Sequence, residues 1–501
     1  MESKLQELKN RLIVINDLQS ANDLLGWDQL TYMPVGGAEA RGRQSATLAR
    51  LAQEMFTDSA IGKLLDELRP YEENMPYDSD EASLIRVTRR EYDRLVKIPS
   101  SLVGELYAHT AASYQAWVIA RQANDFAAMV PFLEKALEFS HRIAEFFPGY
   151  EHIADPLIDF ADYGMKASNI RAIFSQLRAQ QVPIAQAITS LPPADRSCLH
   201  KHYPEAGQLT FANEVVRQIG YDFQRGRVDK THHPFTTKFS LGDVRITTRV
   251  QEDYIGESLF SNIHEAGHAM YEQGIRMAFE GTPLANGTSA GIHESQSRLW
   301  ENIVGRSREF WQFFYPRLQD VFPMQLKDIS LDTFYRAINK VERSLIRTDA
   351  DEVTYNLHVM IRFDLELSLL EGKLAVRDLA QAWQERYRSD IGIVSPTDSD
   401  GVLQDVHWYG GYIGGGFQGY TLGNVMGAQF YECALKAHPE IPGEIEVGKF
   451  DTLHGWLIEN IYQHGSKFTA AELVERITGG SISIEPYIRY LKNKYGEIYQ
   501  I

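Results

Sequence analysis

Apolar residues recur at intervals of three and four along most of this chain, and this helical periodicity restricts its fold more than any other feature. In residues 1–26, one apolar stripe of an amphipathic helix is formed by Leu5, Leu8, Leu12, Ile15 and Leu18. Similar patterns predict helices at 37–56, 80–98, 100–122, 128–147, 167–190, 207–220, 254–279, 292–322, 345–372, 376–390, 449–464 and 483–497. No repeat of roughly 20–50 residues accompanies them, which disfavours a solenoid. We therefore expect a mostly α fold.

Two segments interrupt the helical pattern. Residues 235–250 are rich in β-branched and aromatic side chains around Leu241-Gly242-Asp243, which predicts a β-hairpin. Residues 409–423 contain seven glycines and three tyrosines, so we expect a loop there rather than a helix. That loop is not a phosphate-binding loop, because no Lys-Ser/Thr pair follows its glycines.

Charge and cysteine content exclude several classes of protein. The 501 residues carry a net charge of −17, and an acidic surface repels phosphate backbones, so we expect no nucleic-acid partner. Two cysteines, Cys198 and Cys433, are too few for a disulfide scaffold. The first residues show no signal peptide, and no apolar run approaches the ~20 residues of a membrane span. We expect a cytoplasmic protein without a membrane partner.

The strongest local motif is His264-Glu265-Ala266-Gly267-His268, inside the predicted helix 254–279. Residues four apart lie one turn apart on the same face of a helix, so both imidazoles can hold one metal ion at ~2.0–2.1 Å. Glu265 points about 100° away from His264 and can reach a metal-bound water. This is the arrangement of a zinc peptidase in which a glutamate is the general base.

A catalytic zinc site needs a third protein ligand and one open position. Glu294 follows His268 by 26 positions, at the start of the predicted helix 292–322, and is the expected third ligand. His293 competes for this role. Neighbours on a helix point about 100° apart, so only one of the two is expected to bind. We favour Glu294, because a carboxylate leaves the site with a net charge of about +1, and the ligand set suits zinc or cobalt.

Six separated signatures resemble those of the carboxypeptidase Taq family of metallocarboxypeptidases, in the right order and over essentially the whole chain. They are His233-Pro234-Phe235 (HPF), Asp243–Thr247 (DxRxT), His264–His268 (HExxH), His293–Gln296 (HESQ), Ile346–Asp351 (IRxxAD) and Gly401–Trp408 (GxxQDxHW). The wider relatives of this family are neurolysin-type oligopeptidases and the angiotensin-converting enzymes.

This resemblance implies a mostly α fold, a large helical zincin with a small β-sheet beside a long deep active-site groove. Residues 1–501 would form a single catalytic unit of two helical halves around that groove. The implied activity is the release of single amino acids, with broad specificity, from peptides that have a free C-terminus. One zinc ion per subunit, or cobalt in its place, and a homodimer are also implied.

In the expected reaction, zinc polarises the scissile carbonyl, and Glu265 takes a proton from the metal-bound water and delivers it to the leaving amine. The oxyanion needs a donor besides the metal. Tyr420, in the glycine-rich segment, is the candidate by its resemblance to the related oligopeptidases, and Tyr409 and Tyr412 are its rivals. His407 is a plausible second donor.

A carboxypeptidase must also recognise a free α-carboxylate, which arginine binds best through its two-pronged guanidinium. Arg347, in the IRxxAD signature, is the candidate, although nearby Asp349 and Asp351 offer it an ordinary ion pair. Arg245, in the predicted hairpin, is the alternative. The hairpin 235–250 is expected to flank the groove, since edge strands often pair with extended substrates.

Two other functions stay open at this stage. An endo-acting oligopeptidase would share the metal site but needs no carboxylate clamp, and a peptide with an amidated C-terminus would distinguish it. A catalytically inactive helical binding protein would retain HExxH without activity, and metal analysis combined with Glu265→Gln would reveal it.

Overall fold

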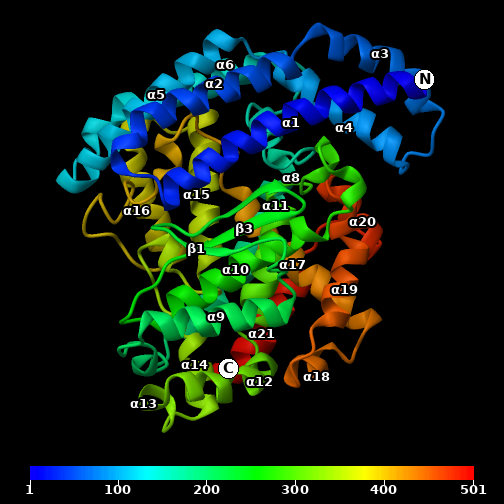
Figure 1. Cartoon of the computed structure of the whole chain (residues 1–501). Coiled ribbons are helices and arrows are strands. Elements are labelled where there is room, and N and C mark those ends of the chain that lie inside the picture. The colour runs from blue at the N-terminus through cyan, green and yellow to red at the C-terminus, as the bar shows by residue number, and fades with distance from the viewer.

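Helices build nearly all of the computed structural model, which describes residues 1–501 (Figure 1). The N-terminal layer lies across the top of Figure 1 and consists of α1 (Glu2–Thr31), α2 (Ala38–Phe56), α3 (Ser59–Glu73), α4 (Asp80–Leu95), α5 (Ser100–Ala123) and α6 (Val130–Glu145). The body below begins with α7 (Asp155–Ile158), α8 (Ala167–Thr189) and α9 (Glu205–Ile219). The mostly α fold is as predicted.

The body continues on both sides of the two central helices, α10 (Ile255–Gly274) and α11 (Ala290–Arg298). The remaining helices are α12 (Arg308–Val321), α13 (Pro323–Leu326), α14 (Leu331–Ile338), α15 (Tyr355–Leu370), α16 (Leu379–Asp390), α17 (Gln418–Ala437), α18 (Ile441–Glu446), α19 (Asp451–Asn460), α20 (Ala470–Thr478) and α21 (Glu485–Tyr499). None of the helices combines the length and the apolar character that crossing a bilayer requires.

The sheet has three short strands in the order β1-β3-β2: β1 (Val228–Lys230), β2 (Thr236–Ser240) and β3 (Asp243–Thr248). Strands β2 and β3 are antiparallel and pair Thr237 with Arg245, so the predicted hairpin is confirmed. Strand β1 is parallel to β3 and was not predicted, because three residues are too few for a recognisable alternation.

Two hydrophobic cores hold the layers. The larger contains 102 buried residues, runs through the body and includes the buried faces of α5 and α6 from the N-terminal layer. The smaller contains 18, and it joins the apolar faces of α1 to α4 to a few body residues just after α10, among them Ile275 and Phe279. The stripe predicted from Leu5 to Ile15 lies in this second core, while Leu18 packs against it only partly buried. The N-terminal layer is thus seated on the segment between α10 and α11.

Several predicted boundaries are wrong. The predicted helix 292–322 is divided into α11, a π-helical turn at Leu299–Val304, and α12, with Gly305 at the break. The predicted helix 345–372 begins only at Tyr355, and Arg347 opens a short 3-10 turn. Helix α11 begins after Ser289, which is its N-cap: the Ser289 hydroxyl accepts from the Ile292 amide at 3.2 Å.

The predicted loop 409–423 also needs correction. Its last part forms the first turns of α17, so Tyr420 lies on a helix. Gly423 and Gly427, one turn apart, face α11: a Cβ on Gly423 would lie 2.7 Å from the Glu294 side chain, and one on Gly427 would lie 2.9 Å from the Ser295 carbonyl oxygen. These glycines therefore serve close helix packing, which outweighs their low helix propensity.

Candidate active site

The HExxH residues lie in the middle of α10, as the sequence predicts. This helix is buried on nearly every side, under the sheet and against α9 and α11. His264 and His268 stand one turn apart with ring centroids 5.0 Å apart. Their side chains are 19% and 16% exposed, so neither imidazole is fully enclosed in the core.

Helix α11 brings Glu294 to these two histidines. Its Oε2 atom lies 3.7 Å from His264 Nε2 and 3.4 Å from His268 Nε2. One donor atom from each of the three residues falls within 4.8 Å of the others, and no other group of His, Cys, Asp and Glu in the chain is arranged in this way. The three predicted ligands are thus gathered from two helices, and His293 is outside the cluster.

Hydrogen bonds at the other ring nitrogens orient both imidazoles. His264 Nδ1 lies 2.9 Å from Glu301 Oε2, and His268 Nδ1 lies 2.7 Å from His293 Nδ1. His293 Nε2 in turn lies 2.7 Å from Glu272 Oε1, and Lys238 forms an ion pair with Glu272 at 2.7 Å. Both Nε2 atoms therefore face Glu294. Hydrogen-bond partners at the far ring nitrogen orient metal-binding histidines in the same way.

The donor set fits a divalent metal. Two imidazoles and one carboxylate are ligands that zinc accepts, and three protein ligands leave one position open. A ligand carboxylate must be ionised. Burial acts to raise the pKa of Glu294, but the Arg298 guanidinium and the two imidazoles outweigh burial and hold that pKa well below its usual range.

Glu265 lies beside the cluster on α10, with 7% of its surface exposed. Its Oε2 atom lies 2.7 Å from the Thr236 hydroxyl, on the first residue of β2. The same hydroxyl lies 2.9 Å from the Glu265 main-chain carbonyl oxygen, so β2 is held against this turn of α10. The contact fixes the Glu265 side chain and leaves its other carboxylate oxygen without a hydrogen-bond partner.

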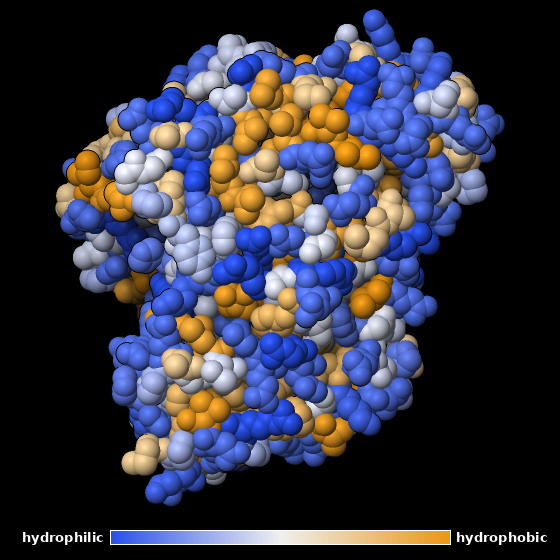
Figure 2. Space-filling view, in the orientation of Figure 1, coloured by the Kyte–Doolittle hydropathy of each residue, from blue (hydrophilic) through white to orange (hydrophobic).

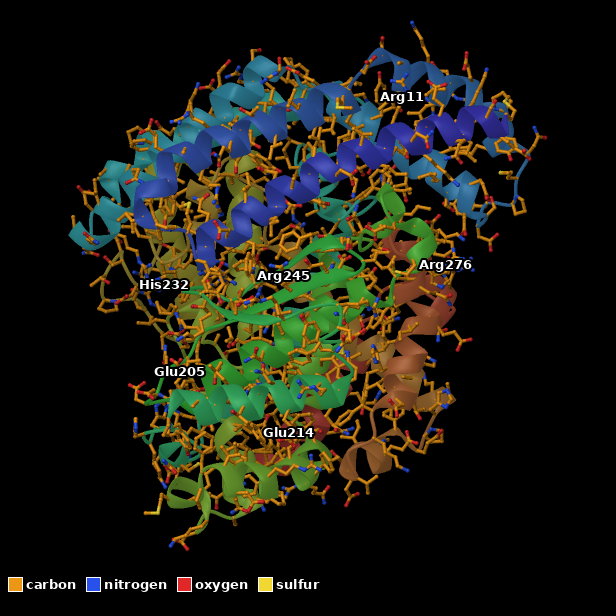
Figure 3. All side chains as sticks on the ribbon, in the orientation of Figure 1. Arg11, Glu205, Glu214, His232, Arg245 and Arg276 are labelled. Carbon is orange, nitrogen blue, oxygen red and sulfur yellow. The ribbon has the colours of Figure 1, made fainter.

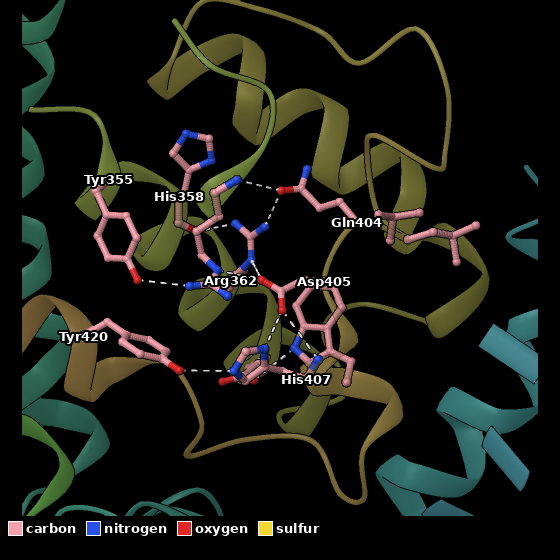
Figure 4. A network of polar contacts seen from close by, with 12 residues as sticks. Tyr355, His358, Arg362, Gln404, Asp405, His407 and Tyr420 are labelled. Atoms are coloured by element: carbon pink, nitrogen blue, oxygen red, sulfur yellow. Dashed lines mark hydrogen bonds and ion pairs between the residues drawn. The ribbon is translucent and has the colours of Figure 1, made fainter. Parts of the chain in front are cut away.

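A polar network contains three other predicted residues, Arg347, His407 and Tyr420. Figure 4 shows this network and labels His407 and Tyr420. Asp405 joins them: its Oδ2 accepts from Arg347 Nε at 2.7 Å, and its Oδ1 accepts from His407 Nδ1. His407 Nε2 lies 3.2 Å from the Tyr420 hydroxyl. Asp405 also pairs with the fully buried Arg362 at 3.0 Å.

Two pKa values in this network are shifted in opposite directions, that of Asp405 by its charged partners and that of Tyr420 by burial. Burial acts to raise the pKa of Asp405, but the His407 hydrogen bond and two guanidinium groups outweigh it, so the pKa lies well below its usual range. Burial raises the pKa of Tyr420 above its ordinary value, so its hydroxyl stays protonated and able to donate.

The other sequence candidates lie apart from this network. Tyr409 is fully buried, and its hydroxyl donates to the Val402 carbonyl at 3.3 Å. Tyr412 packs on Phe160. Arg245 (labelled in Figure 3) forms an ion pair with Asp243 at 2.7 Å and stacks on Trp27 of α1 at 4.5 Å, so it has no contact with Arg347 or the histidines.

Sequence reasoning missed three residues that support the cluster, Glu272, Arg298 and Glu301, and one that joins the polar network, Asp405. Helical spacing contains a signal for three of them. Glu272 continues the His264–His268 stripe by one more turn, and Arg298 and Glu301 follow Glu294 by four and seven positions. Asp405 carried no such signal, because its partners Arg347 and Arg362 are brought to it by the fold.

The model of the family described as Carboxypeptidase Taq (M32) metallopeptidase matches residues 7–495. The chain belongs to this family. It is a metallocarboxypeptidase, a hydrolase that acts on peptides and uses a divalent metal. The clustered His264, His268 and Glu294 are a candidate site for that metal.

Named relatives agree with the assignment of this metallocarboxypeptidase. The chain is 40% identical over 492 residues to thermostable carboxypeptidase 1 of Thermus thermophilus, with 96% of each chain covered. It is 36% identical to carboxypeptidase 1 of Bacillus subtilis, covering 97% of this chain and 96% of the relative. The crystal structure of the M32 carboxypeptidase from Deinococcus radiodurans R1 is 48% identical, with all of both chains covered and a TM-score of 0.97.

Proposed function

We propose that this metallocarboxypeptidase releases single C-terminal amino acids from peptides with broad specificity, with Glu265 as general base beside a metal held by His264, His268 and Glu294. The gathering of these three donors within 4.8 Å, next to Glu265, carries the proposal. The metal is proposed to be zinc, one ion per subunit, with cobalt as the alternative. Bound there, it would supply a Lewis acid and a water of lowered pKa.

Glu265 is proposed to move the proton. Its free oxygen accepts a proton from the attacking water and returns it to the leaving amine. Thr236, which holds the other oxygen at 2.7 Å, keeps the carboxylate in one orientation during both transfers. Preorganisation of this kind avoids reorienting the base within the reaction.

Tyr420 and His407 are proposed as the donors that stabilise the oxyanion. They lie 3.2 Å apart, and Tyr420 is close enough to Glu294 for the carboxylate to influence its pKa. Because Asp405 accepts from His407 Nδ1, His407 donates from Nε2 as an imidazolium, in which both ring nitrogens carry a proton. Two such donors aimed at developing charge contribute typically several kcal/mol to the rate enhancement.

Arg347 is proposed to bind the substrate's α-carboxylate, in preference to Arg245. Its Nε is taken by Asp405 and its Nη1 by the Tyr355 hydroxyl at 3.0 Å, which leaves Nη2 for a ligand. These contacts fix the orientation of the guanidinium. Its Cζ atom lies 5.2 Å from the centre of the Tyr420 ring. Arg245 is already paired and stacked under α1.

If Arg347 binds the α-carboxylate, Arg347→Lys should weaken the enzyme's preference for a free over an amidated C-terminus. We expect kcat/KM for a peptide with a free C-terminus to fall roughly 10–100-fold, the effect of losing a charge-assisted hydrogen bond of about 1.5–3 kcal/mol. An amidated twin peptide, a poor substrate of the wild type, should be affected little. Timed digests followed by mass spectrometry measure both rates.

Arg245→Lys is the matched control and should keep the preference for the free C-terminus. If Arg347→Lys kept it too, Arg347 would not be the clamp. If the wild type cleaved both twins equally, the endo-acting oligopeptidase would be the better description.

Glu272 is predicted to be a positioning residue for the metal. Glu272→Gln removes the carboxylate that accepts from His293, and so weakens the hydrogen bond that orients His268. We expect the affinity for zinc to fall about 10–100-fold, as for other outer partners of metal-binding histidines. Competition with a chelator measures this directly. Glu459→Gln, at an exposed position of α19, should leave the affinity unchanged, and an unchanged affinity in Glu272→Gln would refute the role.

Three further properties are proposed. Residues 1–501 are proposed to act as a single catalytic unit of two helical halves, since one core runs through the body and a second ties the N-terminal layer to it. A homodimer is proposed on the resemblance to the family. A cytoplasmic location is proposed from the two unpaired cysteines, which suit a reducing compartment.

A further inference from the structure

A cavity of about 820 Å³, here called the inner cavity, lies between the N-terminal layer and the body. Helices α1, α2 and α4 line one side, and residues 281–290 line the other. His293 and Glu272 form part of its wall, so it comes within one side chain of His268. Figure 2 shows a hollow in the surface below α1, in the same region.

A second cavity of about 520 Å³, the outer cavity, adjoins the inner one. The two share five lining residues: Val87, Arg90, Arg94, Asp159 and Tyr163. The cavities therefore lie side by side along α4. Neither is lined by Arg347, His407 or Tyr420, so both lie outside the polar network that contains the proposed clamp.

The outer cavity is basic, although the protein is strongly acidic. Six cationic side chains line it, and only three carboxylates do so. Five of the cations come from α4 or the residues just after it: Arg86, Arg89, Arg90, Arg94 and Lys97. Spacings of three and four place them along one face of the helix, so they form a continuous basic wall.

Part of this positive charge has no carboxylate partner within the protein. Arg89 pairs with Asp66, whereas Arg90 and Arg94 both pair with Glu91. Arg86 donates only to the main-chain carbonyls of Tyr77 and Lys467 and to the Ser83 hydroxyl. Lys97 is exposed and has only the Phe147 ring beside it, at 5.4 Å. The cations of Arg86 and Lys97 are therefore free to pair with an anionic ligand.

We propose that the outer cavity binds acidic side chains of the peptide substrate, on the N-terminal side of the bond that is cleaved. This inference rests on the proposed function, because a substrate whose α-carboxylate is held at Arg347 must extend away from it, toward His293 and the inner cavity. A segment rich in Asp or Glu then meets the basic wall of α4. The carboxylates of such a segment can pair with the Arg86 guanidinium and the Lys97 ammonium, which have no carboxylate partner in the protein.

A preference for acidic over basic peptides would distinguish the effect of the outer cavity from that of the protein's overall charge. A net charge of −17 attracts basic peptides and repels acidic ones at long range. A protein without a basic subsite would therefore cleave Lys-containing peptides best. The outer cavity predicts the reverse order, with Glu preferred over Gln and Gln over Lys.

The test uses the metal-loaded enzyme and peptides of equal length with the same C-terminal residue. Each peptide carries a triplet of Glu, Gln or Lys, moved one residue at a time away from the scissile bond. We expect kcat/KM for the Glu peptide to exceed that for the Lys peptide about tenfold at a position distant from the bond. The preference should shrink as salt is raised, because salt screens exposed charges.

Two variants locate the effect. Arg90→Gln and Lys97→Gln should each reduce the Glu preference about threefold and leave turnover of the Gln peptide unchanged. Arg377→Gln removes a charge that is 80% exposed outside both cavities, and it should change nothing.

Equal rates for Glu and Gln peptides at every position, or a preference for Lys, would overturn the inference while leaving the carboxypeptidase intact. A second contrary result would be that added inorganic phosphate alters turnover of the Gln peptide while Glu peptides are not preferred. The cavity would then be a site for a free anion. If no peptide lost its C-terminal residue, the proposed function itself would fail, and the inference with it.

Discussion

Glu265→Gln is expected to lower kcat about 10²–10⁴-fold, the usual contribution of a general base, while the enzyme keeps its metal. The amide matches the shape of the carboxylate and can still contact Thr236, but it cannot accept the proton of the attacking water. Because Glu265 is not among the three clustered donors, metal content should equal that of the wild type. Peptide turnover and metal content, measured on the same preparation, check both expectations.

A second glutamate on the same helix supplies the control for Glu265→Gln. Glu257 lies two turns earlier on α10 and pairs with Arg249 at 2.8 Å, outside the cluster. Glu257→Gln should retain nearly full kcat. If Glu265→Gln retained it too, with the metal in place, another group would have to be the base.

Glu294→Ala is expected to remove both the metal and the activity. It deletes one of the three proposed ligands and leaves the buried Arg298, which donates to Glu294 Oε1 at 2.6 Å, without its nearest carboxylate. Breaking such a buried pair costs roughly 3–5 kcal/mol of folding stability. Metal analysis after gel filtration and unfolding in denaturant measure the two losses separately.

Glu309 offers a control for Glu294→Ala, because it lies in the first turn of α12 and forms no ion pair. Glu309→Ala should keep the metal and nearly all of the stability. Wild-type metal content in Glu294→Ala would mean that His293 or another group is the third ligand. In that case the double variant with His293→Ala should lose the metal.

The candidate metal site could be predicted from the sequence because local geometry determines most of it. Helical spacing places His264 and His268 on one face of α10, whatever surrounds that helix. Glu294 was selected by charge and by its place at the start of a second helix, and the structure brings its Oε2 to within 3.7 Å of both Nε2 atoms. The same spacing would have revealed Glu272 and Arg298.

The glycine-rich segment shows where local reasoning fails. Residues 409–423 were predicted to be a loop because a segment this rich in glycine disfavours a helix. In the folded protein, the missing side chains at Gly423 and Gly427 allow α17 to lie against α11, next to Glu294. The packing of α11, which is distant in sequence, thus decides the conformation of this segment. The composition of residues 409–423 alone cannot predict that contact.

The sequence by itself determined the helical class, the hairpin, the two-histidine turn and the signatures that led to the family. Each depends on spacing along one element, where backbone geometry relates the residues directly. Only the tertiary structure decided that Asp405 joins Arg347 to His407, that Arg245 is occupied by Asp243 and Trp27, and that α4 presents a basic wall to the outer cavity. These contacts join segments distant in the chain, and the packing of helices against one another creates them.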